Sequence, residues 1–226
     1  MQVQQKQNIK GFSLLELLVV LAIIGAVAGV GFPNFNKWSI DRNIRAQSEK
    51  VATIFSIATT QVERGEYPYV RVEFKSTSGS EDPEKQIITV KGLNLEKLSG
   101  KLNDSRVGPP TCKASDVDSD ILAQKILDKK VKLFHLEKSD GAVCFSKGAK
   151  YFKQYGKADT QQNVNIPKTE SGTNKFVVVC HKKMTSCNPV GGNFSDDYPV
   201  YLVKYSRFGF IEKYKWNKNE KDWKSR

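Results

Sequence analysis

The chain has few of the residues that catalysis and metal binding commonly use. Its 226 residues include two histidines, His135 and His181, which stand far apart in the sequence, and four cysteines with no Cys-x-x-Cys pair among them. There is no Gly-x-Ser-x-Gly elbow and no glycine-rich phosphate loop after a strand. These absences exclude the common hydrolase and nucleotide-binding motifs, and we expect a protein that is not an enzyme and needs no cofactor.

Acidic residues are also scarce, with 24 Asp and Glu against 36 Lys and Arg, which gives a net charge of +12. A surplus of cations of this size favours anionic partners. Internal repeats and low-complexity tracts are absent from the sequence, and its length suits one folded domain beyond any terminal segment.

One long apolar run stands out against this polar background. Residues Phe12 to Phe35 supply 24 mainly apolar residues in which Glu16 is the only ionisable side chain. About 20 such residues are enough for a helix to span a bilayer. Because a carboxylate in lipid costs a few kcal/mol or more, Glu16 requires a cationic partner in some assembled state.

The start of the chain resembles type IV pilins and pseudopilins, whose leader ends in Gly and is followed by Phe-Thr/Ser-Leu-x-Glu and an apolar helix. Gly11, Phe12, Ser13, Leu14 and Glu16 stand at the corresponding places. The resemblance implies that a prepilin peptidase cuts after Gly11 and methylates the new amine of Phe12. It also implies that Glu16 pairs with the Phe12 amine of a neighbouring subunit during assembly.

Two other readings of the same segment compete with this one. A secretory signal peptide is cut beyond its apolar core after small residues, and no Ala-x-Ala pattern follows this segment. A plain signal anchor, holding an unrelated periplasmic binding or enzymatic domain, has no need of Glu16 or of Gly11 directly before Phe12.

The fold class that we expect is α+β and pilin-like, with a long N-terminal helix packed on an antiparallel sheet. The domains are a leader at 1–11, a transmembrane or filament-core helix at 12–35, an amphipathic helical half at 36–64 and a β-rich domain at 65–226. Apolar residues recur at helical spacing as far as Val62, and Gly65 and Pro68 then end the helix. We expect Pro33 and the glycines before it to break or bend this helix.

Alternating or apolar runs predict the strands of the β-rich domain, which are Tyr69–Phe74, Gln86–Lys91, Val131–Leu136, Ala142–Lys147, Lys175–His181, Val200–Tyr205 and Phe208–Trp216. Between them we expect a polar loop at Ser76–Glu84 and a short helix at Asp118–Lys129. Irregular chain is expected at Lys101–Ser115 and at Gly156–Asn174.

A second resemblance concerns the GspH/FimT family of minor pseudopilins and minor pilins. It rests on the helix from Asn43 to Gly65, which ends in Glu63-Arg64-Gly65 before an alternating strand. It implies a part near the tip of a type II secretion pseudopilus, or a minor pilin of a type IV pilus. Some members of the family contact DNA.

Pilin topology would place all four cysteines outside the cytoplasm, where disulfides form. Three connectivities are open. We favour Cys180 with Cys187 because the segment between them is short, and this leaves Cys112 with Cys144. The alternatives are a zinc site that adds His135 and His181, or a catalytic Cys-His pair.

Basic and aromatic residues alternate in the C-terminal tail, a composition that suits contact with nucleic acid. The candidate contacts are Arg207, Lys213, Lys215, Lys218, Lys221 and Lys224. In the alternative reading, Phe208, Phe210, Tyr214 and Trp216 share one strand face and belong to the core, and the lysines are a solvated surface. Calcium at Asp116, Asp118 and Asp120 is a further alternative, although helix capping explains these acids more simply.

The function that we expect is that of a minor pilin or pseudopilin, in the inner membrane with its C-terminal domain in the periplasm, and later in a pilus or pseudopilus. Its expected partners are other pilin subunits, the prepilin peptidase, membrane lipid and the assembly platform of a type II secretion or type IV pilus machine. DNA is an alternative partner.

Overall fold

The structure is a computed structural model. It describes residues 12–79, 82–97, 99, 119–135, 142–147, 154–155, 175–189, 194, 198–206 and 209–226. Several sequence expectations fall outside this part of the chain, namely the leader with Gly11, the two irregular segments, and the residues Cys112, Asp116, Asp118 and Arg207. The chain divides into two units, Met1–Ile40 and Asp41–Arg226, which are described separately.

Helix α1 runs without interruption from Leu14 to Arg64 and belongs to both units. Gly65 follows it with a φ of 78°, a left-handed conformation that glycine adopts at low cost and that ends helices, as the sequence predicted. The helix is not interrupted at Pro33, so the expected break does not occur there, and the expected bend stays a prediction. A proline removes one hydrogen bond to the preceding turn, and the neighbouring turns keep theirs.

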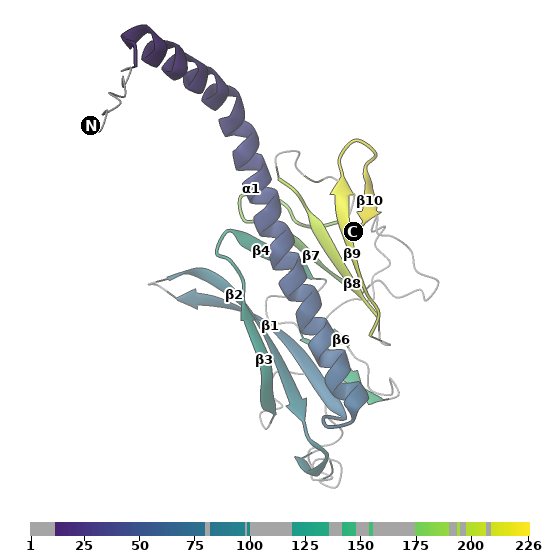
Figure 1. Ribbon diagram of the computed structural model, residues 1–226. Helices are drawn as coiled ribbons and strands as arrows, with labels where there is room; N and C mark the ends of the chain where they lie inside the picture. Colours follow the sequence, from purple (N-terminus) through teal and green to yellow (C-terminus); the bar gives the residue numbers. More distant parts are fainter. Residues whose placement is uncertain are drawn as a thin grey trace, which may run out of the picture. The chain divides into compact units, whose positions relative to one another are not determined.

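The strands of the second unit form two antiparallel sheets (Figure 1). Sheet A has the order β3-β2-β1-β5-β6 and consists of β1 (Tyr69–Gly79), β2 (Asp82–Leu93), β3 (Asp120–Ile126), β5 (Ala142–Ser146) and β6 (Gln154–Tyr155). Sheet B has the order β10-β9-β8-β7-β4 and consists of β4 (Val131–His135), β7 (Phe176–His181), β8 (Tyr201–Tyr205), β9 (Ile211–Asn217) and β10 (Asp222–Ser225). A helix followed by antiparallel sheets is an α+β arrangement consistent with a pilin-like fold.

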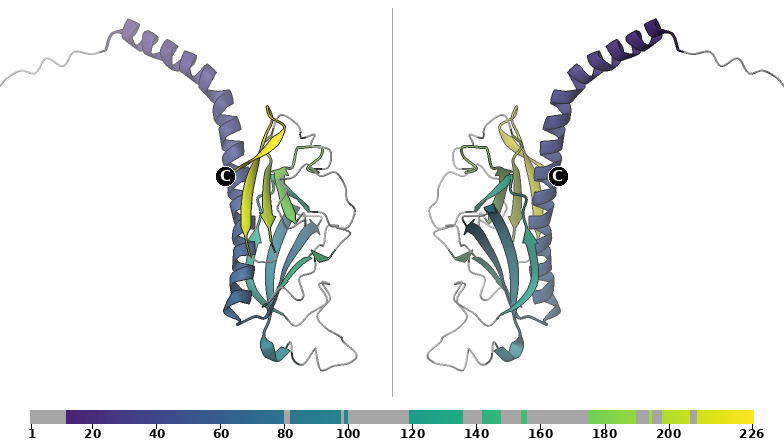
Figure 2. Two further views of the ribbon diagram at one scale, coloured as in Figure 1. Left: turned by 90° about the vertical axis from the view of Figure 1, so that its right-hand side faces the viewer. Right: turned by 90° about the vertical axis from the view of Figure 1, so that its left-hand side faces the viewer.

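Phe55 lies at the centre of the second unit, where α1 packs on both sheets (Figure 2). Its ring stacks on Tyr205 of β8 with centroids 4.2 Å apart, and it meets Phe74 of β1 and Phe145 of β5 at 6.2 Å each. The helical residues that share this buried face are Ile44, Val51, Ile54, Ala58 and Val62. Their spacing of three, four and seven is the pattern from which the sequence predicted an amphipathic helix.

Two sequence expectations about the sheets are wrong, and one strand was missed. The segment from Asp118 was expected to be a helix, but from Asp120 to Ile126 it is the edge strand β3. Its register against β2 shifts between Val90 and Lys91, and such an irregularity disturbs the period-two pattern that identifies a strand. The expected loop at Ser76–Glu84 instead includes the end of β1 and the start of β2, and β10 was not expected at all.

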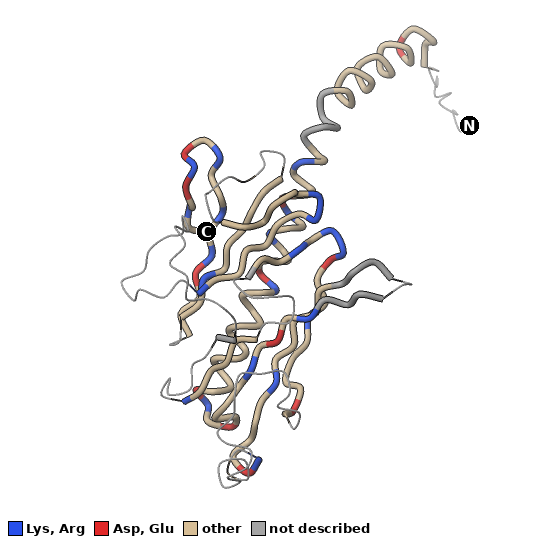
Figure 3. The backbone as a smooth tube through the Cα atoms, turned by 180° about the vertical axis from the view of Figure 1, so that it is seen from behind, with Lys and Arg blue, Asp and Glu red and all other residues tan. Residues whose placement is uncertain are grey.

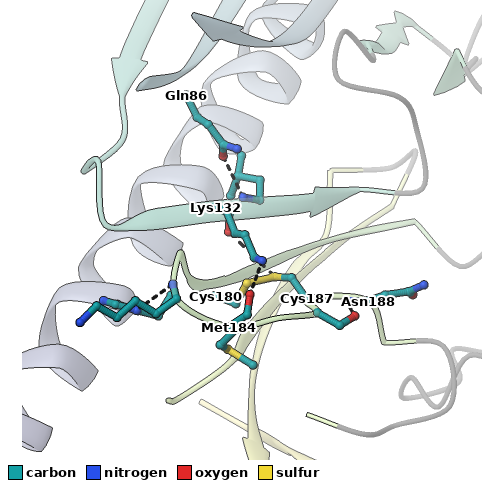
Figure 4. The surroundings of a disulfide bond; sticks show 10 residues. Gln86, Lys132, Cys180, Met184, Cys187 and Asn188 are labelled. Carbon is teal, nitrogen blue, oxygen red and sulfur yellow. Dashed lines mark hydrogen bonds between the residues drawn. A yellow bond between two sulfur atoms is a disulfide. The ribbon is translucent and has the colours of Figure 1, made fainter. Parts of the chain in front are cut away.

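A second core lies on the other face of sheet B. It gathers Phe176, Val178, Cys180, Met184, Cys187, Phe194, Val200, Leu202, Trp216 and Trp223. Cys180 and Cys187 form a disulfide, as the sequence predicted, and this bond ties the segment after β7 over the sheet (Figure 4). Lys132 of β4 donates a hydrogen bond from Nζ to the Met184 carbonyl inside the loop that the disulfide closes.

Cys144 of β5 is buried and is also disulfide-bonded. Because Cys112 lies outside the described residues, the pairing of these two cysteines stays a prediction. Cys180 and Cys187 cannot ligate zinc while they are joined to each other, and the described residues contain no group of three His, Cys, Asp or Glu that could hold a metal ion. Asp120, from the calcium alternative, forms an ion pair with Lys97 at 2.7 Å.

Candidate functional site

The first turn of α1 is capped by Ser13. The Oγ of Ser13 accepts a hydrogen bond from the Leu15 N–H at 3.3 Å, and its carbonyl accepts one from the Leu17 N–H at 3.2 Å. Ser13 is therefore the N-cap residue, and Glu16 lies at the third position of the helix. A carboxylate in the first turn is favourable there, because the N-terminus of a helix carries a partial positive charge.

The side chains that follow Ser13 form an apolar surface on every side of the helix. All described side chains from Phe12 to Gly29 are exposed, with Phe12 at 86% and Leu14 at 76%. A helix that is apolar all round is stable in water only when something covers it, such as lipid or other helices. Within the part of the chain that the structure describes, no helix carries an apolar stretch long enough to cross a membrane.

The location of Glu16 allows its carboxylate to offset a nearby positive charge. It is the only ionisable residue from Phe12 to Phe35. If the chain is cut after Gly11, the amine of Phe12 adds a positive charge at the positive end of the helix dipole, where a cation is disfavoured. A carboxylate three residues beyond the N-cap can offset this charge, either in the same chain or in a neighbouring one.

The tail lysines that were proposed to contact nucleic acid are mostly held by carboxylates. Lys213 lies 2.7 Å from Glu49 of α1, and Lys215 lies 2.7 Å from Asp41. Lys224 pairs with Glu220 in its own hairpin. Lys218 and Lys221 are exposed in the turn between β9 and β10. These pairs show that part of the basic tail serves to hold sheet B on the helix.

The aromatic residues of the tail divide differently from either reading of the sequence. Trp216 and Trp223 are buried and their rings meet edge to face at 5.2 Å, so they are not available to stack on bases. Tyr214 is partly buried against the same core. The alternative reading placed Phe210 in the core, and this placement is wrong. Phe210 precedes β9 and is 71% exposed.

The structure also contains a buried charge cluster that the sequence did not indicate. Arg71 and Glu73 of β1 are each 2% exposed and form an ion pair, and Lys91 of β2 lies 3.0 Å from Glu73. Alternation of charged and apolar residues, which here predicted only a strand, is typical of a strand with one solvated face. Both faces of β1 are in fact buried. The alternating pattern is therefore no guide to the exposure of these two residues.

His181 ends β7 and is stacked on Tyr198, with ring centroids 4.3 Å apart. Its Nδ1 accepts a hydrogen bond from the Lys183 N–H at 3.2 Å. Burial lowers the pKa of His181 below its ordinary value, and the charges of Lys183 and Lys130 lower it further. A histidine in this setting is neutral at pH 7 and has a packing role.

Comparison with known proteins bears on the first part of the chain. Residues 6–32 match the protein family described as the prokaryotic N-terminal methylation motif. No curated protein and no solved structure matches the chain. The matched residues include the capped first turn, Glu16 and the exposed apolar helix, and the motif supports a type IV pilin-like protein that is processed by a prepilin peptidase and anchored to a membrane through its N-terminal region.

Proposed function

We propose that this protein is a minor pilin or pseudopilin, a structural subunit of a type II secretion pseudopilus or a type IV pilus. A prepilin peptidase removes residues 1–11 and methylates Phe12. Before assembly the subunit is inserted in the inner membrane with its second unit in the periplasm. It then joins the filament by packing its N-terminal helix against other subunits. The observation that carries this proposal is an exposed apolar helix with one carboxylate in its first turn.

Assembly follows from the two needs of this helix. Its apolar surface is covered by lipid before assembly and by the helices of other subunits afterwards. The carboxylate of Glu16 has no cationic neighbour in its own apolar run, and pairing with the Phe12 amine of a neighbouring subunit stabilises both charges out of water. The pair also selects the axial offset between subunits, since only one offset brings the two groups together.

Processing is tested by producing the full chain together with a prepilin peptidase and measuring its N-terminal mass. A chain that begins at methylated Phe12 is expected. An intact chain beginning at Met1, in the presence of active peptidase, contradicts the proposal and favours a plain membrane anchor.

Assembly is tested with Glu16→Ala, for which we expect normal cleavage and little incorporation into filaments. Glu66→Ala is the matched control, because Glu66 is an exposed carboxylate beyond the end of α1. Normal incorporation of Glu16→Ala refutes the ion-pair role. Equal losses in both variants point to a general effect of charge.

A DNA-binding minor pilin is the second candidate, and the exposed cations of the second unit are the observation in its favour. The buried tryptophans and the ion pairs of Lys213 and Lys215 weaken it. A gel shift with the processed full chain in detergent tests it. Binding that falls steeply with salt is expected for phosphate contacts, and no shift at low salt removes this candidate.

A further inference from the structure

Of the exposed cations that the structure describes in the second unit, most lie at one end, around the first turns of α1 that belong to it. We call this surface the basic collar, and it consists of Arg42, Arg45, Lys129, Lys183, Lys218 and Arg226. All six side chains are exposed. They come from α1, from three separate turns and from the C-terminus. Figure 3 marks Lys and Arg in blue along the backbone.

The turn at 127–130 is held directly against the helix. Asp128 accepts a hydrogen bond from the Asn43 side chain at 3.0 Å, and its N–H donates to the Gln47 side chain at 3.2 Å. The next turn, at 182–183, is held to the first one, since the Lys182 N–H donates to the Lys130 carbonyl at 2.7 Å. Lys129 and Lys183 therefore lie at the level of residues 43–47 of α1.

The β9–β10 hairpin brings cations to another side of the helix. Lys213 pairs with Glu49 and Lys215 with Asp41, so β9 runs antiparallel to α1. The following turn, with Lys218, projects about 10 Å beyond Lys215, because a strand advances about 3.3 Å per residue.

Arg45 and Arg226 complete the collar on this side. The hydroxyl of Tyr201 donates a hydrogen bond to Asp41 at 3.1 Å, which places this tyrosine beside the first turn of the unit. Burial and the neighbouring Asp41 raise the pKa of Tyr201 above its ordinary value, and the charges of Arg226 and Arg45 oppose this shift. The Arg226 N–H donates a hydrogen bond to the Lys213 carbonyl at 2.9 Å, and Arg45 lies four residues after Asp41 on α1.

The described acidic groups on the elements that form the collar are partly engaged by other residues. Asp41 and Asp128 are half-buried and already bonded to Lys215, Tyr201 and Asn43. The hairpin contributes Glu220 and Asp222, of which Glu220 is engaged by Lys224. The cations of the collar outnumber these acids, and the surface attracts an extended negative partner.

The position of the collar along the chain indicates the chemistry of that partner. Arg42 follows Phe35, the last residue of the apolar run, by seven residues of continuous helix, or about 10 Å at 1.5 Å per residue. When the apolar run lies in hydrocarbon, Arg42 and Arg45 come within reach of the headgroup layer. Basic residues at that depth bind anionic lipids.

We propose that the basic collar binds the headgroups of anionic phospholipids and so holds the second unit against the membrane before assembly. This inference rests on the proposed function, in which the N-terminal helix is inserted. Nucleic acid is the less suitable occupant, because Trp216 and Trp223 of the β9–β10 hairpin are buried and offer no stacking surface.

The test uses the processed full chain in nanodiscs of phosphatidylcholine, with or without one third phosphatidylglycerol. Hydrogen exchange is followed by mass spectrometry. We expect amides in the turns at 127–130, 182–183 and 218–221 to exchange about tenfold more slowly in the anionic discs, and this difference to disappear in high salt. Equal exchange of the turns in both kinds of disc overturns the inference.

Two variants separate the collar from total charge. Lys129→Gln/Lys183→Gln/Lys218→Gln is expected to abolish the difference between discs. The matched control, Arg64→Gln/Lys75→Gln/Lys147→Gln, removes the same charge from exposed positions outside the collar and keeps the difference. If the control variant loses the difference between the two kinds of disc to the same extent, specific binding by the collar is refuted.

Exchange in residues 14–24 distinguishes failure of this inference from failure of the proposed function. Protection of these amides in both kinds of disc reports insertion of the helix. If these helix amides are not protected, the proposed function fails. If they are protected but exchange in the turns is the same in both kinds of disc, only the lipid-binding role of the collar is refuted. Protection of the turns by added duplex or single-stranded DNA in zwitterionic discs, with none by phosphatidylglycerol, also overturns the lipid assignment and favours nucleic acid.

Discussion

Phe55 provides the sharpest test of how the second unit is held together. Its side chain is 0% exposed and touches residues of α1, sheet A and sheet B at one point. Replacing it with alanine removes the apolar contacts of a buried ring and leaves a cavity between three elements, each of which is fixed by its own hydrogen bonds. Phe→Ala changes in such cores cost about 3–5 kcal/mol, and we expect Phe55→Ala to fall in the upper half of this range.

The stacked contact with Tyr205 adds to the loss. Aromatic pairs contribute about 0.5–1.5 kcal/mol beyond the area that they bury. Phe55→Leu keeps part of the volume but no ring, and we expect it to cost about 1–2 kcal/mol. The order of stability is then native, Phe55→Leu and Phe55→Ala.

Urea unfolding of the full chain in detergent, followed by tryptophan fluorescence, measures these differences. Trp216 and Trp223 are buried in sheet B and report on the second unit. Phe210→Ala is the matched control, because this phenylalanine is 71% exposed and its loss is expected to change the free energy of unfolding by less than about 0.5 kcal/mol. Equal losses for Phe55→Ala and Phe210→Ala would refute the central packing.

Three further predictions concern single features of the fold. Gly92→Ala is expected to cost about 1–3 kcal/mol in urea unfolding, because a Cβ would lie 2.5 Å from Cδ1 of Tyr67, whereas Gly29→Ala, with nothing within 4 Å, is expected to cause no loss. The double variant Cys180→Ser/Cys187→Ser is expected to lose about 2–3 kcal/mol with the Cys144 disulfide intact, and an unchanged urea midpoint would contradict the role of this bond. A hydrogen bond from Asn43 is the main reason that the pKa of Asp128 is held below its ordinary value of 3.8, so the stability that the ionised group contributes is present above that pH and is lost as the pH falls through the lowered pKa. NMR titration should find a higher pKa for Asp128 in Asn43→Ala, and an unchanged value would exclude this hydrogen bond as the cause.

The helix and most strands could be predicted because their signals are local. The buried positions of α1, such as Val51, Phe55 and Val62, recur at the helical period, and Gly65 marks the end of the helix. Strand partners are a different matter, since alternation identifies a strand but carries no information about its neighbour. The pairing of β1 with β5, which follows more than 60 residues later, depends on contacts across the whole unit.

The buried pair of Arg71 and Glu73 illustrates the same limit at the level of single residues. Charged residues are almost never fully buried unless they are paired, so a pattern of alternating charge and apolar residues predicts exposure. Here the two charges neutralise each other on the face of β1 that looks away from Phe55. Only the three-dimensional arrangement, which covers both faces of this central strand, shows that these two residues are buried.

The basic residues of the tail show why composition alone gave two incompatible readings. Alternation along β9 sends Lys213 and Lys215 to the face that packs on α1 and Trp216 to the opposite face, where it meets Trp223. A mixture of cations and aromatics in sequence is therefore separated by the sheet into an ionic contact and an apolar core. The cations that remain exposed join those of two distant turns, because strands β4, β7 and β9 all have a terminus at the same end of sheet B. Among the described residues, the topology thus brings several exposed cations of sheet B to the same end as Arg42 and Arg45 of α1, and an anionic surface there would be recognised by position as much as by charge.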